Sequence, residues 1–334
     1  MDEKIPVLNF FIDPEHYPYD YDPALSINAP AHRQLKLALS SANTWLLWTL
    51  RTYLELKDRY TCRLTDQMPE NGIVFFFRGS VSMEQRPGND QFWVCLVADS
   101  TWHPFSQINV FQNLEASRRY RQSFFKRHWP PLSVLRRRQS RDGLKRIYYM
   151  GDRTNLSQEF RSADWTRFLK TEGFTFVCPP VGKWNDYRKA DAALAARSFD
   201  GDPYLNKPAS KLINAWLGHV VFIGTPESAY EAEKKGTLDM VIVESYAALK
   251  ITLLRLRDDL ELFHRYQDRS AERSTEYNID IYRRDWEQLI DGHVLPLAAT
   301  WFNQTRASYR YYLFMRKIQK IVFSLRYRLN RNRC

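Results

Sequence analysis

Basic side chains cluster around the start of one short helix-like run, where they could bind phosphate. Arg197 ends an apolar stretch, and Lys207, Ser210 and Lys211 follow, the last three within "NKPASKLINAWLG". The first turn of a helix exposes unpaired backbone N–H groups and the positive end of the helix dipole. Two lysines there oppose the dipole unless an anion is bound, so the pattern predicts a diphosphate site.

The same cations also have simpler structural interpretations. Lys207 and Lys211 could extend into solvent from the first helical turn. Arg197 could instead form an ion pair with Asp191 or Asp202. These alternatives require no ligand.

A second polar turn follows the next apolar strand. In "GTPES", residues 224–228, Glu227 could accept hydrogen bonds from ribose hydroxyls, with Ser228 beside it, or Glu227 could simply cap the following helix. Upstream of this strand, Gly218 is expected in the left-handed conformation that ends many helices. The sequence "DGD", residues 200–202, matches an Asp-x-Asp metal pattern, but a Gly between two Asp is first a turn signal, so we expect no bound metal.

The strands that must position these residues are expected at uninterrupted apolar runs. Strands are expected at 7–12, 73–77, 92–98 and 108–113 in the first part, and at 146–151, 174–178, 192–196, 220–224 and 240–243 in the second. Helices are expected at 34–56, at 163–170 with Ser162 as N-cap and Gly173 as its end, near 210–217, and over 247–290. Apolar runs without alternation indicate strands covered on both faces, and therefore an α/β fold with parallel sheets.

The pattern divides the chain into two Rossmann-like domains that would face each other across a cleft. We expect a first domain at 1–117, a basic interdomain linker at 118–145, a second domain at 146–275, and C-terminal helices with a basic tail at 276–334. In such domains ligands bind beyond the carboxyl ends of the strands. That rule places the site at the facing edges of the two sheets.

The net charge of +11 is concentrated in two segments. Residues 118–146 hold eleven Lys/Arg against one acid, residues 306–334 hold nine and no acid, and the rest of the chain is net −8. This distribution favours local anionic partners over a nucleic-acid-binding body. The four scattered cysteines, an acidic start without the features of a signal peptide, and the lack of a long apolar stretch predict a cytoplasmic, soluble or peripherally attached protein.

Residues 309–329 form an expected amphipathic helix. Its apolar side comprises Leu313, Phe314, Ile318, Ile321, Val322, Leu325 and Leu329, and Arg316, Lys317, Lys320 and Arg328 lie on or beside the other side. With the cationic tail, this composition suits an anionic membrane surface through residues 309–334. The alternative is a terminal helix packed across both domains with a solvated basic face.

The segment 207–230, which contains the expected diphosphate site, resembles the donor-nucleotide motif of GT-B glycosyltransferases. "KPASKLINAW" followed by "GTPESAY" is similar to a bacterial polysaccharide-cluster group with KPA(S/T)KLxNAW and GPESAY, and it has a distant likeness to fucosyltransferase donor domains. The likeness extends over "FRGS", "ADSTWHPFSQINVFQN", "HWPP" and "WNDYRKADAALAARSF", about two thirds of the chain. The chain departs from the group in "LGHVVFIGT": it lacks the proline that is common after the first Gly and the one that is common before the second Gly, and His219 and Thr225 replace the usual residues.

The resemblance implies a GT-B fold and a metal-independent sugar transfer without a cofactor. The second domain would bind a nucleotide-diphospho-sugar, and the first would bind a glycan or lipid-linked acceptor in polysaccharide or glycolipid assembly, at the inner face of the membrane. In an inverting reaction a base in the first domain would deprotonate the acceptor; the candidates, each after an apolar strand, are Asp99, His103, Asp13 and His16. Two alternatives are a non-catalytic nucleotide-sugar or glycan-binding module and a basic nucleic-acid-binding protein.

Overall fold

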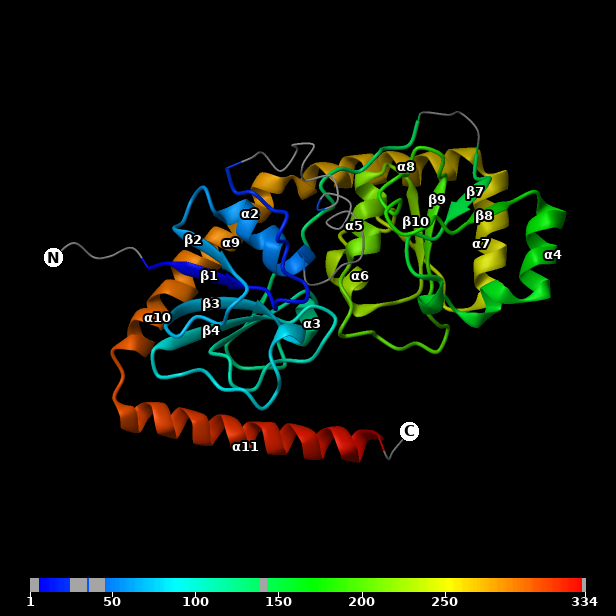
Figure 1. Ribbon diagram of the computed structural model, residues 1–334. Coiled ribbons are helices and arrows are strands. Elements are labelled where there is room, and N and C mark those ends of the chain that lie inside the picture. Colours follow the sequence, from blue (N-terminus) through cyan, green and yellow to red (C-terminus); the bar gives the residue numbers. More distant parts are fainter. Residues whose placement is uncertain (1–5, 25–34, 36–45, 139–142, 332–334) are drawn as a thin grey trace.

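The chain forms two parallel sheets, each flanked by helices (Figure 1). The structure, a computed structural model, describes residues 6–24, 35, 46–138 and 143–331. It confirms the predicted α/β class with two parallel sheets and a long C-terminal helix. Part of the helix predicted at 34–56 lies outside the described residues; its end at Leu56 is confirmed.

The first sheet has six strands in the order β2-β1-β3-β4-β5-β6, all parallel. They are β1 (Leu8–Phe11), β2 (Cys62–Thr65), β3 (Gly72–Phe77), β4 (Gln91–Leu96), β5 (Ile108–Phe111) and β6 (Ser123–Phe125). The strand order reverses between β1 and β3, which is where doubly wound sheets bind ligands. Strand β6 lies inside the segment predicted as a linker, and β2 has no counterpart among the predicted strands.

The second sheet has five strands in the order β11-β10-β9-β7-β8, again all parallel. They are β7 (Arg146–Tyr148), β8 (Thr175–Val177), β9 (Ala192–Ala195), β10 (Val221–Gly224) and β11 (Val241–Ile242). Each coincides with a predicted apolar run, although all five strands are shorter than the run. The strand order reverses between β7 and β9.

Helices cover both sheets. The longer ones around the second sheet are α4 (Ala163–Glu172), α5 (Ser210–Leu217), α6 (Ser228–Glu233), α7 (Tyr246–Asp258) and α8 (Leu260–Ser274). Short turns of helix are η2 (Leu46–Leu50), η3 (Arg78–Ser80), η4 (Arg153–Asn155), η5 (Gln158–Arg161) and η6 (Thr275–Tyr277), with α2 (Arg51–Leu56) and α3 (Leu114–Ser117) beside the first sheet. As predicted, Ser162 caps α4 by accepting from the Trp165 N–H at 3.1 Å, and Gly173 ends it in the left-handed region.

The prediction for Gly218 is wrong. Gly218 has a right-handed conformation with φ of −80°, and the following residue, His219, takes the left-handed one with φ of 56°. A Cβ atom at Gly218 would lie 2.5 Å from Cγ of Tyr187. Close packing against this ring, not a positive φ, is therefore what requires glycine here.

The C-terminal helices return to the first sheet. In Figure 1 the orange α9 (Ile279–Leu289) and α10 (Leu295–Phe302), joined by the helical turn η7 (Ile290–Val294), run back past the blue and cyan strands, and the red α11 (Arg306–Arg331) lies below them. Trp286 of α9 stacks on Trp129 with ring centroids 5.9 Å apart. We call the first sheet with α2, α3 and α9–α11 the first lobe, and the second sheet with α4–α8 the second lobe.

The basic segment at 118–146 is not a free cationic stripe. Lys126 pairs with Asp285 at 2.6 Å, and Arg127 pairs with Glu233 at 2.8 Å. Further along, Arg137 is buried in an ion pair with Asp191 at 2.8 Å. These cations are used in ion pairs within the protein, and the Arg127–Glu233 pair joins the two lobes, which weakens the nucleic-acid interpretation. Within the described residues, no helix combines the length and the apolar character needed to cross a bilayer.

Candidate functional site

The carboxyl ends of the two sheets meet at residues that the sequence had singled out separately. Lys207 Nζ, in the loop before α5, lies 2.8 Å from Oδ2 of Asp99, which follows β4. Asn113, which follows β5, donates through Nδ2 to the carbonyl of Lys207 at 3.1 Å and to Ser228 Oγ at 2.8 Å. The Ser228 hydroxyl in turn donates to the carbonyl of Pro203. These bonds bring three predicted site residues, Asp99, Lys207 and Ser228, together with the unpredicted Asn113 and Pro203.

The N-terminus of α5 carries no side-chain cap. The helix starts at Ser210, with Ala209 in the cap position, so its first N–H groups point out of the helix without a capping side chain. Lys211 in this first turn lies with Nζ 5.4 Å from the ring centre of Tyr149, which follows β7. An uncapped helix start beside a lysine is a suitable place for an anion.

Lys211 is held in an electrostatically unusual setting. Burial, followed by repulsion from Arg197, lowers the pKa of Lys211 from 10.5 to about 8. The backbone of Gly151 passes close to the lysine, because a Cβ there would lie 3.0 Å from Lys211 Cε. A nearby anion would restore the charged form of Lys211 by offsetting both effects.

Arg197 pairs with Glu227 and with neither of the aspartates considered earlier. Arg197 Nε lies 3.2 Å from Glu227 Oε1, and only 1% of the Glu227 side chain is exposed. Asp191 instead accepts from Arg137 and Arg146 in a buried cluster at the start of β7 and β9. Both ion pairs that the sequence offered for Arg197 are therefore absent.

Glu227 occupies the N-cap position of α6, but its side chain does not cap that helix. Burial raises the pKa of the Glu227 carboxyl, while the Arg197 and Lys211 charges offset part of the rise. The carboxyl therefore faces the cations at the start of α5. Counting Arg197, Lys207 and Lys211 against Glu227 and Asp99, the cluster has one excess positive charge, which favours an anionic ligand.

A cavity of about 270 Å³ adjoins this cluster at the carboxyl ends of β9, β10 and β11. It is lined by residues 198–202, Thr225, Pro226 and Glu244, so carboxylates and the ring of Phe199 surround it. Asp200 and Asp202 each accept a backbone N–H two residues ahead, at 3.0 and 2.8 Å. The Asp-x-Asp sequence thus forms a turn, as its glycine indicated.

Asp13 and His16 form a second polar pair, beyond β1 in the first lobe. His16 Nδ1 lies 2.5 Å from Asp13 Oδ1, and Ser80, at the end of η3, donates to Asp13 Oδ2 at 2.8 Å. Burial tends to raise the pKa of Asp13, but the hydrogen bonds from His16 and Ser80 outweigh it, so the pKa lies below its usual value. This pair sits at the point where the first sheet reverses its strand order.

A carboxylate of Glu15 joins this pair, with ligand atoms of the three residues within 4.8 Å of one another. Three ligand atoms this close together could contact a single cation. Exposed acidic groups gather in this way without an ion, and Asp13 and His16 already bind each other. The geometry therefore assigns no metal.

His103 is placed differently from the other three base candidates. It is fully buried; its Nε2 lies 3.0 Å from the carbonyl of Ser82, and its Nδ1 accepts from the Phe105 N–H at 3.3 Å. Burial lowers the pKa of His103 to about 4. Both ring nitrogens are thus used by the protein, and the imidazole serves the packing of the loop after β4.

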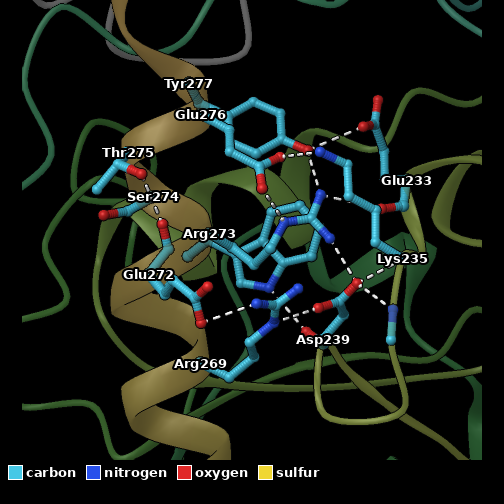
Figure 2. A network of polar contacts seen from close by, with 12 residues as sticks. Glu233, Lys235, Asp239, Arg269, Glu272, Arg273, Ser274, Thr275, Glu276 and Tyr277 are labelled. Carbon is cyan, nitrogen blue, oxygen red and sulfur yellow. Dashed lines mark hydrogen bonds and ion pairs between the residues drawn. The ribbon is translucent and has the colours of Figure 1, made fainter.

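A buried network fixes the far ends of α5 and α6. Figure 2 shows Arg273 of α8 reaching Asp239 and the backbone of Glu233, the last residue of α6. The Arg273 guanidinium also lies 4.2 Å from the ring centre of Trp216 near the end of α5. Arg127 of the first lobe pairs with the Glu233 carboxylate. The network therefore holds the two helices whose N-terminal ends carry the site.

Sequence reasoning missed Tyr149, Asn113 and the Arg127–Glu233 pair. Tyr149 and Asn113 each follow a strand, and that position was the available signal. The sequence offers no comparable signal for Arg127 and Glu233, which are 106 residues apart.

Comparison with known proteins yields structural likenesses only. No protein-family model matches the sequence, and no curated protein does. Among solved structures, the chain is similar to TarM, with 8% identity, a TM-score of 0.47 and coverage of 71% of this chain and 56% of TarM. It is also similar to Anabaena HepE in complex with UDP and glucose, with 5% identity, a TM-score of 0.48 and coverage of 86% and 100%.

A third likeness is to sucrose-phosphate synthase from Thermosynechococcus elongatus, with 12% identity, a TM-score of 0.46 and coverage of 76% and 80%. The chain spans less than two thirds of the length of TarM and of the GtfA/B structure, of which it covers 60%. At TM-scores below 0.5, these likenesses do not establish an activity for this chain.

Proposed function

We propose that the protein transfers a sugar from a nucleotide-diphospho-sugar to a glycan or lipid-linked acceptor. The observation that carries the proposal is the convergence of Arg197, Lys207 and Lys211 on the uncapped N-terminus of α5. The resemblance of the "KPASKLINAW" motif to donor motifs of GT-B glycosyltransferases supports it. Transfer in polysaccharide or glycolipid assembly is the process that this resemblance suggests.

The donor diphosphate would bind at the start of α5. Its negative charge would attract Lys207 away from Asp99 and would keep Lys211 protonated. As the bond between sugar and diphosphate breaks, charge builds on the leaving oxygen, and these cations with the helix N–H groups would stabilise it. In this scheme the leaving group needs neither a metal nor a cofactor.

The nucleoside would occupy the adjoining cavity of about 270 Å³. Carboxylates such as Glu244 accept hydrogen bonds, so they suit ribose hydroxyls, and the ring of Phe199 suits a flat base. Glu227 directly follows Pro226 of the cavity wall in the sequence, and it would accept from the ribose while still paired with Arg197.

The acceptor would bind in the first lobe, with His16 as the base. In this scheme Asp13 would orient the imidazole by accepting from Nδ1, and Nε2 would take the proton. The acceptor hydroxyl would give its proton to His16, and Asp13 would stabilise the resulting imidazolium. Asp99 would hold Lys207 in an ion pair in the empty site, and this pair would break when the diphosphate binds. Buried His103 has no role in this scheme.

We further propose that residues 309–334 contact an anionic membrane surface at the cytoplasmic face. The contact would bring a lipid-linked acceptor to the first lobe, which carries α11. Cys62, Cys95 and Cys178 are unpaired thiols, in keeping with a reducing compartment.

Calorimetric titration of the purified protein with UDP, GDP, CDP and TDP tests the donor site. We expect one nucleotide to bind, and Lys207→Met and Lys211→Met each to weaken it at least about tenfold. Lys170→Met, an exposed lysine on α4, is the matched control and should bind normally. Unchanged affinity in both site variants would refute the assignment. Binding without turnover of the matching sugar donor would favour the non-catalytic module.

A further inference from the structure

Helix α11 packs on the first lobe through one defined face. Tyr309 donates to the carbonyl of Pro87 at 2.8 Å, and Tyr312 donates to the carbonyl of Phe105 at 3.1 Å. Arg316, only 5% exposed, donates to the carbonyl of Ser106 at 3.0 Å. Because these contacts recur every three or four residues, they fix the rotation of the helix about its axis.

The opposite side of α11 is an apolar stripe without a partner among the described residues. Its members are exposed by 38–66%: Tyr311, Phe314, Ile318, Ile321, Val322 and Leu325. Five of them were predicted to form the apolar face of this helix, yet that face points away from the lobe. Over 26 residues the helix is about 39 Å long, and in Figure 1 it lies along the outside of the first lobe. The stripe is thus a long, linear apolar surface at the edge of the molecule.

The helix that carries this stripe is strongly cationic in sequence. The segment 306–331 contains eight Lys/Arg and no Asp/Glu. A second copy of the chain bound through the same stripe would bring two such sets together, and like charges would repel. An anionic surface is complementary to both the apolar stripe and the cations, which is the arrangement of helices that lie in a membrane interface.

A cavity of about 280 Å³ opens between α11 and the loop at 84–86. Arg86, Lys317 and Lys320 supply positive charge to its wall, and Phe105, Ile321 and Leu325 supply apolar surface. Lys320 is paired with Glu84, whereas Arg86 lies with its guanidinium 5.1 Å from the ring centre of Phe105. Two members of the wall, Ile321 and Leu325, also belong to the apolar stripe.

From this geometry we propose that α11 docks on a bilayer of anionic phospholipid and that the cavity at Arg86 and Lys317 holds the phosphate of one lipid head group. The acyl chains would continue along the stripe at Ile321 and Leu325. The inference deepens the membrane contact proposed above, and it holds whether or not the protein transfers sugar. It places the acceptor side of the molecule, the first lobe, against the lipid.

Vesicle flotation of the full chain tests the docking surface. The probes are vesicles of phosphatidylcholine alone and the same vesicles with about one third phosphatidylglycerol. We expect strong binding only to the anionic vesicles, and a loss of at least about tenfold in Phe314→Ser/Ile321→Ser, which removes exposed apolar area without touching the packed face. Failure of the native chain to bind anionic vesicles would overturn the proposal. Self-association that the double variant abolishes, without vesicle binding, would identify a second copy as the partner instead.

Two variants of equal charge test the cavity itself. Arg86→Gln/Lys317→Gln removes two cations from the cavity, and Arg306→Gln/Arg310→Gln removes two exposed cations from the same helix outside it. Each removed charge near an anionic surface costs about fivefold in binding. Loss of a charged hydrogen bond to phosphate adds about tenfold more in the cavity variant. Equal losses in the two variants would show diffuse attraction only and would overturn the head-group site. Unchanged melting temperatures confirm that both variants are folded.

Discussion

The pH dependence of nucleotide binding should report on Lys211. In the empty site the pKa of Lys211 is lowered to about 8, first by burial and then by Arg197. A bound diphosphate favours the charged lysine and raises this pKa again. The folded, unliganded site therefore loses its proton as pH rises through 8, and binding above that pH must take a proton up.

The magnitude follows from the pKa of the free site. With a pKa of about 8, about nine tenths of the protein carries charged Lys211 at pH 7, and about one tenth does at pH 9. The affinity for a nucleoside diphosphate should therefore fall about tenfold over this range. Above pH 7 the phosphate groups are almost fully ionised, so the ligand itself contributes little to the change.

Titration calorimetry at pH 7, 8 and 9, in buffers of different ionisation enthalpy, measures both the affinity and the proton uptake. Lys211→Arg is the matched control, because arginine stays charged throughout and its affinity should be nearly flat with pH. Lys211→Met should bind at least about tenfold more weakly at pH 7 and be equally flat. A wild-type affinity that does not fall by pH 9, or a fall that persists in Lys211→Arg, would refute this account of the site.

Three further substitutions test the surrounding structure. Asp99→Asn frees Lys207 from its exposed ion pair, so nucleoside diphosphate should bind about threefold more tightly in calorimetry; weaker binding would contradict the placement of the diphosphate. Asp239→Asn leaves Arg273 buried without its principal charge partner, and urea denaturation should show a loss of about 3 kcal/mol in the free energy of unfolding. Gly218→Ala drives a methyl group into a tyrosine ring, and the same measurement should show a loss of about 2 kcal/mol; a neutral effect would mean that the ring moves freely.

Apolar runs in the sequence were enough to locate the central strands of both sheets. Strands β2 and β6 were not predicted because they are short edge strands. Their sequences, "CRLT" and "SFF", lack the long apolar run of a strand buried on both faces. The sequence also could not show why residue 218 is a glycine. A glycine required by close packing against Tyr187 cannot be told, in sequence, from a glycine required by a positive φ.

The candidate site was predictable one residue at a time, but its contacts were not. Each of Asp99, Lys207 and Ser228 lies where a polar residue follows a strand or precedes a helix, and local pattern captures that position. Their meeting depends on how the two lobes pack, which no local pattern encodes. The same holds for α11. The sequence predicted an amphipathic helix there, but not which face packs on the first lobe. The face with Tyr309, Tyr312 and Arg316 packs because these side chains donate to carbonyl groups of distant loops.

Donor turnover is the most direct test of sugar transfer. The purified protein would be incubated with UDP-, GDP-, CMP- and TDP-sugars, and release of the nucleotide would be followed by chromatography, with and without a glycan or lipid-linked acceptor. The account predicts release from one donor, stimulated by an acceptor, lost in Lys211→Met and strongly reduced in His16→Gln, with no change in Lys170→Met. Absence of turnover with every donor, from a protein that still binds a nucleoside diphosphate through Lys211, would contradict it.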